Sequence, residues 1–271
     1  MEKARTESPI AALADETFAA MQVAESGARR ALQKLAAGMC GAVRWPGLLS
    51  QHLDEIAARV TQPSFETYDE ERLVPPILKF GPAVHDYYVN GKLHEEYWKK
   101  AETARAAWRH HFDELDPMKT VADSLAGELG IPVRPATIDG KSLYVGILRE
   151  FPHGSKIHYD EIAREFPGHL DEEPIVQLAF NCHVTVADEG GELTVWKHRW
   201  VPDDDSRKDG YGWLSDVVAH APSVTVRAEA GEGVFFDCRN LHQVAQPRGS
   251  RRITLSAFMG FTLDGNLILW S

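Results

Sequence analysis

The composition of the chain changes near Gly140, and no other feature of the sequence constrains the fold as strongly. Downstream, short runs rich in Val, Ile, Leu, Phe, Thr and Trp alternate with clusters of Gly, Pro and Asp, which is typical of strands separated by turns. Many short strands of this kind favour a sandwich or barrel. We predict strands at 142–151, 175–186, 192–200, 223–228, 233–237 and 252–263.

Upstream of Gly140, strong helix formers dominate. Asp116-Pro117 is a good N-cap and first-turn pair for one helix, and Gly130 is a good stop. The prolines within 62–76 indicate a loop. We predict one α+β domain over 1–271, mainly helical to residue 140 and then a double-sheet β core. The predicted upstream elements are helices at 11–35, 48–60, 94–115 and 118–129, and a strand at 41–45.

The charge balance argues against a nucleic-acid partner, because 29 Lys and Arg face 40 Asp and Glu, for a net charge of -11. Three cysteines without paired spacing indicate free thiols in a reducing compartment. The first residues lack a secretory pattern, and no apolar run approaches the ~20 residues needed to cross a bilayer. We therefore expect a cytoplasmic protein with no membrane or nucleic-acid partner.

The segment His158-Tyr159-Asp160 is the sharpest local signal for a site. In an extended segment, residues i and i+2 point to the same side, so this imidazole and carboxylate can converge on one ion. Alone the pair is a weak signal, because a chain with 12 His has a considerable chance of containing one, and a surface pair is the alternative.

His242 supplies a second imidazole, directly after a turn and an apolar strand at 230–237. Two imidazoles and one carboxylate on a β scaffold form the facial triad that suits Fe(II) and leaves coordination positions open. We therefore predict that His158, Asp160 and His242 hold a catalytic metal.

Arg252 follows His242 by ten positions and shares one strand face with Thr254 and Ser256. Its planar guanidinium suits the far carboxylate of a dicarboxylic co-substrate. We predict this role for Arg252, with hydroxyl contacts from Thr254 and Ser256. Arg251 is interpreted as a solvated surface charge.

Other segments give weaker signals. Gly190-Gly191 permits a tight turn and a close backbone approach. Residues 202–216 form a long polar connection, which we predict to be a lid, with disorder as the alternative. Several aromatic side chains are candidates to line an apolar pocket, although a core or surface position explains each equally well: Tyr144, Tyr159, Trp196, Tyr211 and Trp213.

The order HxD, Gly-Gly-x-Leu turn, distal His and Arg about ten residues later resembles the Fe(II)/2-oxoglutarate-dependent dioxygenases. The chain is most similar to the branch of welwitindolinone-type alkaloid halogenases and related small-molecule hydroxylases. That similarity rests on 189–196, the Arg251-Arg252 pair and the chain end at 265–271.

The resemblance implies a double-stranded β-helix (jelly-roll, cupin-like) core, Fe(II) held by the triad, and Arg252 paired with 2-oxoglutarate. It also implies that O2 and 2-oxoglutarate give succinate and CO2 while a small molecule, such as an amino-acid derivative or natural-product intermediate, is hydroxylated or otherwise oxidised. The halogenases have Gly, and bind the halide, where this chain has Asp160. The carboxylate therefore favours hydroxylation over halogenation.

Two other classes stay open. A cupin-type metal-dependent isomerase or epimerase also places His and carboxylate ligands on a β barrel, but it has no need of a buried arginine at position 252. A non-enzymatic β-sandwich binding module does not account for the helical first half of the chain or for the open ligand set.

Overall fold

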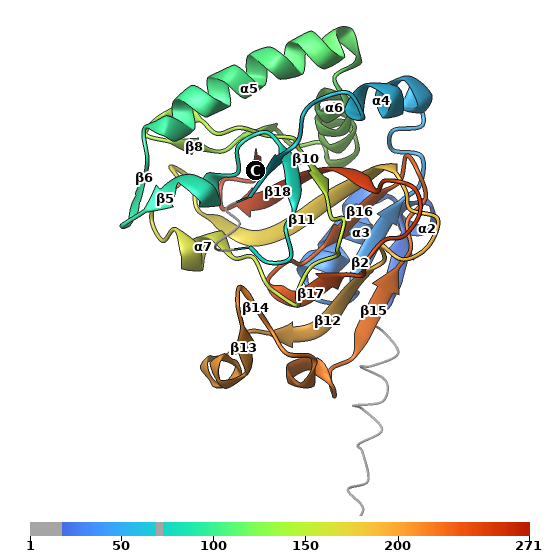
Figure 1. The fold of residues 1–271 in the computed structure, drawn as a ribbon, viewed down its shortest axis with the longest axis vertical. Helices are drawn as coiled ribbons and strands as arrows, with labels where there is room; N and C mark the ends of the chain where they lie inside the picture. Colours follow the sequence, from blue (N-terminus) through green and yellow to red (C-terminus); the bar gives the residue numbers. More distant parts are fainter. Residues whose placement is uncertain (1–17, 69–72) are drawn as a thin grey trace, which may run out of the picture.

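Two facing sheets form the core of the protein, and helices cover the outer face of the larger sheet (Figure 1). The computed structural model describes residues 18–68 and 73–271, and the statements below concern these residues. This arrangement is the predicted jelly roll with helices packed on it.

The larger sheet is mostly antiparallel, and its central pair is β11 with β18. β19 (Leu267–Trp270) pairs with β18 and with β7 (Val133–Pro135). The remaining strands follow the order β1 (Ala20–Gln22), β2 (Ala42–Trp45), β16 (Gly233–Phe236), β11 (Pro174–Thr185), β18 (Ile253–Thr262), β10 (Ile147–Glu150), β4 (Leu78–Phe80) and β3 (Glu66–Thr67).

The smaller sheet has three strands in the order β15 (Ser223–Val226), β12 (Leu193–Arg199) and β17 (Asn240–Val244). All its pairings are antiparallel, with Val195 opposite His242. β17 therefore carries the distal histidine on the sheet that faces the central strands. Three short hairpins, whose strands have two residues each, lie outside both sheets. They are β5 (Tyr88–Val89) with β6 (Lys92–Leu93), β8 (Thr137–Ile138) with β9 (Lys141–Ser142), and β13 (Lys208–Asp209) with β14 (Gly212–Trp213).

The period-two alternation of the strands separates two hydrophobic layers. In β18, Ile253 and Leu255 pack toward the helices, whereas Phe258 faces the space between the sheets. The inner face also carries the buried polar residues Thr254 and Ser256. The helices are α2 (Val23–Ser26), α3 (Ala28–Ala36), α4 (Leu53–Val60), α5 (Glu96–Phe112), α6 (Pro117–Leu129) and α7 (Ile162–Glu165), with single-turn 3-10 helices η1 (Val84–Tyr87), η2 (Asp113–Leu115), η3 (Pro202–Arg207) and η4 (Ser215–Val218).

The predicted end signals of α6 are confirmed. The Asp116 carboxylate accepts from the backbone N–H groups of Met118, at 2.9 Å, and Lys119, at 3.2 Å. Gly130 ends the helix in the left-handed region, at φ 62°. The six strands predicted downstream of Gly140 are also found, although the run at 142–151 is interrupted by Gly146, at φ 90°.

The prediction of one helix over 11–35 is wrong where the structure can test it, and residues 11–17 lie outside the described part. Strand β1 occupies Ala20–Gln22 because it pairs in parallel with β2, and Gly27, at φ 75°, separates α2 from α3. Tertiary pairing here overrides helix propensity. The predicted helix at 48–60 begins only at Leu53, after His52 in the left-handed region.

The division at residue 140 is also only partly right. The upstream part contributes β1, β2, β3, β4 and β7 to the larger sheet, so it is built into the core as well as packed on it. These short strands carry few alternating residues, which is why they give a weak pattern.

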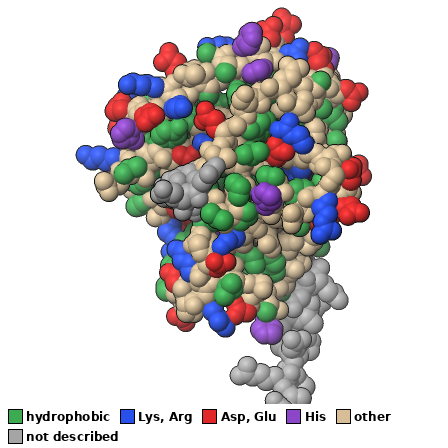
Figure 2. All heavy atoms as spheres, in the orientation of Figure 1, with side chains coloured by type: hydrophobic (Ala, Val, Ile, Leu, Met, Phe, Trp, Pro, Cys, Tyr) green, Lys and Arg blue, Asp and Glu red, His purple; other side chains and the backbone are tan. Residues whose placement is uncertain are grey.

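The remaining global expectations concern thiols, charge and membranes. Cys40, Cys182 and Cys238 are free and buried, and burial raises the pKa of the Cys40 thiol to about 11. Figure 2 shows acidic and basic side chains interspersed over this face. In the described ranges, no helix has both the length and the apolar character to span a bilayer.

Candidate active site

His158, Asp160 and His242 converge as predicted. One Asp160 oxygen, Oδ2, lies 3.9 Å from His158 Nε2 and 3.5 Å from His242 Nε2. The three potential ligand atoms all lie within 4.8 Å of one another. Because metal–ligand bonds are about 2.0–2.2 Å long, atoms at these separations can share one ion. The donor set is the two-histidine, one-carboxylate triad that suits Fe(II).

Backbone pairing brings the ligands together from distant parts of the chain. His158 and His242 form an antiparallel bridge, in which each N–H donates to the other's carbonyl, at 3.0 and 2.8 Å. The Asp160 N–H donates to the carbonyl of Cys238, at 2.9 Å. The i, i+2 spacing then turns the His158 and Asp160 side chains to the same side, as the sequence pattern predicted.

Hydrogen bonds also fix which ring nitrogens face the metal position. His158 Nδ1 donates to the carbonyl of Lys156, at 2.8 Å, and His242 Nδ1 donates to the carbonyl of Asn240, at 3.0 Å. With the proton on Nδ1, each Nε2 lone pair is directed at the ion.

The electrostatics of the triad favour metal binding. Burial, followed by the proximity of His242, lowers the pKa of His158 to about 4, so the ring is neutral at physiological pH. Burial alone would raise the pKa of Asp160, but the proximity of His242 and His158 holds it well below its usual range. A neutral imidazole and an ionised carboxylate are the forms that bind a metal.

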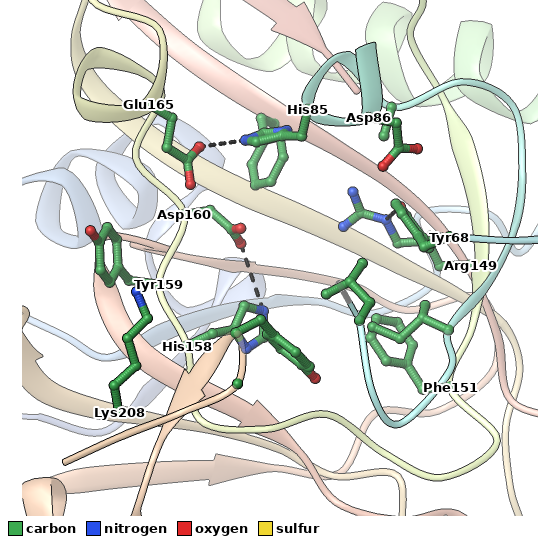
Figure 3. A pocket seen from close by; sticks show the side chains of 16 residues that line it. Tyr68, His85, Asp86, Arg149, Phe151, His158, Tyr159, Asp160, Glu165 and Lys208 are labelled. Carbon is green, nitrogen blue, oxygen red and sulfur yellow. Dashed lines mark hydrogen bonds and ion pairs between the residues drawn. The ribbon is translucent and has the colours of Figure 1, made fainter. Parts of the chain in front are cut away.

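Beside the triad, a cavity of about 570 Å³ opens to solvent (Figure 3). This volume falls within the range of small-molecule sites. The cavity is lined by ionisable side chains from four elements: His85 and Asp86 of η1, Arg149 of β10, Glu165 of α7 and Lys208 of β13. Aromatic side chains complete much of the wall: Tyr68, Phe151, Tyr159, Tyr211 and Phe258.

Arg252 lies inside the barrel with 3% exposure. Its Nε donates to the Gly191 carbonyl, at 2.9 Å, and one terminal nitrogen lies 3.0 Å from His183 Nε2. The other terminal nitrogen, Nη1, is buried and has no hydrogen-bond partner in the described chain. Burial lowers the pKa of Arg252 to about 10, because among the described residues no carboxylate forms an ion pair with it.

An unpaired buried guanidinium fits a carboxylate ligand. His183 cannot serve as the counter-charge, because burial and the nearby Arg252 hold its pKa well below the ordinary value and keep it neutral. The orphaned Nη1 is therefore direct structural support for an anionic ligand at the inner end of the barrel.

Phe151 packs against this arginine and lines the cavities beside the triad. It lines the same cavities as His158, and its ring centroid lies 5.6 Å from Arg252 Cζ. The inner cavity behind the triad measures only about 30 Å³, the space of one or two waters.

Thr254 and Ser256 share the inner face with Arg252 as predicted, but their hydroxyls already have partners. They lie 3.1 Å from each other, and Ser256 Oγ donates to Asn181 Oδ1, at 2.6 Å. Asn181 lines the small cavity, whereas Thr254 and Ser256 do not. Arg251 turns the other way and pairs with Glu150, at 2.6 Å, so the interpretation of a simple solvated charge missed a partner.

The predicted close approach at Gly190-Gly191 is confirmed. Gly191 has φ 75°, and a Cβ there would lie 2.8 Å from Arg252 Cδ. A Cβ on Gly190 would lie 2.1 Å from the Gln246 carbonyl oxygen. The glycine pair lets the backbone contact the arginine directly.

Residues 202–216 form η3, the β13–β14 hairpin and η4 rather than a structureless loop. Trp213 pairs with Ile157, and the Tyr211 hydroxyl accepts from the Lys156 N–H, at 2.7 Å. Lys208, Gly210 and Tyr211 line the large cavity. Closure of this segment as a lid stays a prediction.

Of the aromatic candidates, Tyr159 and Tyr211 line the cavity. Tyr144 belongs to the buried core, whereas Trp213 and Trp196 belong to a separate small cluster. No sequence pattern indicated His85, Asp86, Arg149 or Glu165, because they lie in segments without a metal or nucleotide motif. The one available signal was a charged residue, Arg149, within an apolar strand.

The jelly-roll core and the two-histidine, one-carboxylate triad define an enzyme of the mononuclear non-haem iron, 2-oxoglutarate-dependent oxygenase class. A family model described as "Carrier-protein-independent halogenase WelO5" matches residues 26–271. The chain belongs to this family.

Individual relatives agree with this assignment. The chain is 40% identical over 260 residues to the L-gamma-glutamyl-L-propargylglycine hydroxylase of Streptantibioticus cattleyicolor, which covers 94% of this chain and 97% of the relative. It is 29% identical to leucinostatins biosynthesis cluster protein S of Purpureocillium lilacinum, over 75% of this chain and 89% of that protein. The crystal structure of an N-substituted L-amino acid dioxygenase from Burkholderia ambifaria shares the fold, with TM-score 0.59, 15% identity and coverage of 90% and 91% of the two chains.

Proposed function

We propose that this protein hydroxylates an unactivated C–H bond of a small amino-acid derivative, using Fe(II), O2 and 2-oxoglutarate and releasing succinate and CO2. The observation that carries the proposal is the complete triad, in which the potential ligand atoms of His158, Asp160 and His242 all lie within 4.8 Å of one another. Bound iron and co-substrate would supply the O2 activation and C–H oxidation.

The residues of the chain supply binding and orientation. His158, Asp160 and His242 would hold Fe(II), each histidine fixed by its Nδ1 hydrogen bond. Arg252 would bind the distal carboxylate of 2-oxoglutarate through its unpartnered Nη1. Ser256 and Thr254 would act through their hydroxyl chain to Asn181, which lines the inner cavity.

Asp160 favours hydroxylation over halogenation, although the family model is described as a halogenase. A halide can join the metal only where a protein ligand leaves a coordination position free. The Asp160 carboxylate, 3.5 Å from His242 Nε2, would take that position here. The 40% identical relative is named as a hydroxylase, which supports the same outcome.

The geometry weighs against the other two classes. An isomerase or epimerase of cupin type has no use for a buried, unpaired arginine at the inner end of the barrel. A simple binding module does not explain two histidines with their metal-facing nitrogens oriented by backbone hydrogen bonds.

Two measurements test the proposal. Anaerobic Fe(II) plus 2-oxoglutarate is expected to give a weak visible charge-transfer band with the purified protein, and a colourless complex at saturating co-substrate would contradict the assignment. With O2 admitted, succinate release is then measured against a panel of amino-acid derivatives, together with mass spectrometry for a gain of one oxygen atom. Succinate formation in the absence of Fe(II) would also count against it.

A further inference from the structure

Arg149 is the second inward-facing arginine of the barrel, and the roles assigned above do not use it. Its Nε donates to the Tyr68 hydroxyl, at 3.0 Å, and its Cζ lies 5.6 Å from the ring centroid of Phe258. These contacts fix the guanidinium plane while its two terminal nitrogens point into the cavity beside the triad (Figure 3).

The acids around Arg149 have partners of their own, and Asp160 lies beside the two triad histidines. Asp86 pairs with Lys79, Glu150 pairs with Arg251, and Glu165 pairs with His85. Across the described ranges, no carboxylate forms an ion pair with Arg149, which retains its positive charge. A half-buried fork with free terminal nitrogens is a site for a carboxylate.

A group of opposite character lines another part of the same cavity. Glu165 and His85 form an ion pair there, and the His85 ring centroid lies 6.0 Å from that of Phe258. In Figure 3 this pair and Arg149 lie on different sides of Asp160. The pair offers an acid and a base together, which complements an ammonium and a carboxylate carried on one carbon.

We propose that the substrate is a dipeptide-like molecule whose terminal carboxylate binds Arg149 and whose zwitterionic amino-acid end binds the Glu165–His85 pair. A free α-amino acid carries both charges on one carbon and satisfies only one of the two sites. A γ-glutamyl dipeptide places the amino-acid end and the terminal carboxylate at opposite ends, and it is the substrate type in the name of the 40% identical relative. The assignment rests on the proposed oxygenase function, because that function makes this cavity the substrate site.

Calorimetric titration of the anaerobic enzyme loaded with Fe(II) and 2-oxoglutarate tests the assignment. The probes are L-γ-glutamyl-L-propargylglycine, its C-terminal amide and free L-propargylglycine. We expect the dipeptide to bind about 30-fold or more tightly than either of the other two, since each lacks one charged contact. In Arg149→Met, dipeptide affinity falls about 30-fold, and the difference between acid and amide shrinks to less than about threefold.

Arg164→Met is the matched control, because it removes the same charge one residue from Glu165. Arg164 is half-exposed, pairs with Glu161 and does not line the cavity, so dipeptide affinity should change less than about threefold. Equal losses in both variants would reveal a general field effect and overturn the specific contact.

Further outcomes separate this inference from the proposed function. If Arg149→Met weakens 2-oxoglutarate instead of the dipeptide, Arg149 belongs to the co-substrate site and the inference is wrong. If the dipeptide fails to bind, or free L-propargylglycine binds equally well, the substrate class is wrong even though the charge-transfer band forms. Absence of the band in wild type overturns the proposed function itself.

Discussion

Arg149 on β10 and Arg252, directly before β18, both face the barrel interior, yet their surroundings differ. Arg252 is 3% exposed and contacts the Gly191 carbonyl, a neutral histidine and the Phe151 ring. Arg149 donates a hydrogen bond to the Tyr68 hydroxyl and lines the cavity of about 570 Å³. On the proposed function, the closed end would bind one small anion, and the open end would bind a larger molecule that enters from solvent.

The triad lies between the two ends and links their chemistry. Burial depth decides what each arginine contributes to binding. A fully buried charge without a partner raises the free energy of the unliganded protein, so a matching carboxylate is bound strongly. A partly solvated guanidinium contributes less binding free energy per contact and acts mainly on selectivity.

We expect the largest effect from a change in the metal triad, between the closed and the open end. Asp160→Gly removes the carboxylate ligand, so hydroxylation should fall about a hundredfold or more, while the fold is retained. Product formation by mass spectrometry and Fe(II) affinity by titration measure the loss. Full hydroxylation in this variant would show that Asp160 is not a ligand.

Arg252→Met should weaken 2-oxoglutarate binding by about 2–4 kcal/mol, because the co-substrate carboxylate loses its only buried cationic partner. Arg149→Met is the matched control and should change 2-oxoglutarate affinity less than about threefold. Titration of the charge-transfer band measures both. Equal losses of 2-oxoglutarate affinity in the two variants would show that the closed and open ends do not bind different ligands.

Gly191→Ala should weaken 2-oxoglutarate binding about tenfold, because the new Cβ would lie 2.8 Å from Arg252 Cδ and displace the guanidinium. Dipeptide binding at Arg149 should be unaffected. The φ of 75° adds a stability cost of about 1–3 kcal/mol, measured by urea unfolding. A co-substrate affinity equal to wild type would show that Gly191 does not position Arg252.

The smallest effect concerns pH. His183 stays neutral in the folded protein because burial and the charges of Arg252 and Arg44 hold its pKa well below the ordinary value. The unfolded chain binds a proton below about pH 6.5, so unfolding is favoured as pH falls. Between pH 7.5 and 5.5, metal-free wild type should lose about 1.4 kcal/mol through His183.

His183→Gln lacks this titrating group and should lose correspondingly less stability over the same interval. Urea unfolding of both proteins at the two pH values gives the comparison. The same pH dependence in wild type and variant would mean that His183 is protonated in the folded state, and so supplies a second positive charge at the closed end.

The metal ligands were predictable from sequence because alternation and strand order act locally. His158 and Asp160 are two residues apart, and His242 lies in a strand that follows a glycine turn. The α6 helix was predictable for the same reason, since Asp116 and Gly130 act on their own helix ends. The role of Arg252 was inferred from the family resemblance. The sequence could only predict that its side chain is buried.

The sequence by itself determined the β core and the shared side of His158 and Asp160, because both follow from short-range periodicity. Only the tertiary structure decided that Ala20–Gln22 is a strand, because its partner β2 lies 20 residues away. It alone decided that Arg149, His85 and Glu165 share one cavity. Charges from three separate elements meet through packing, and packing depends on long-range contacts that no local pattern records.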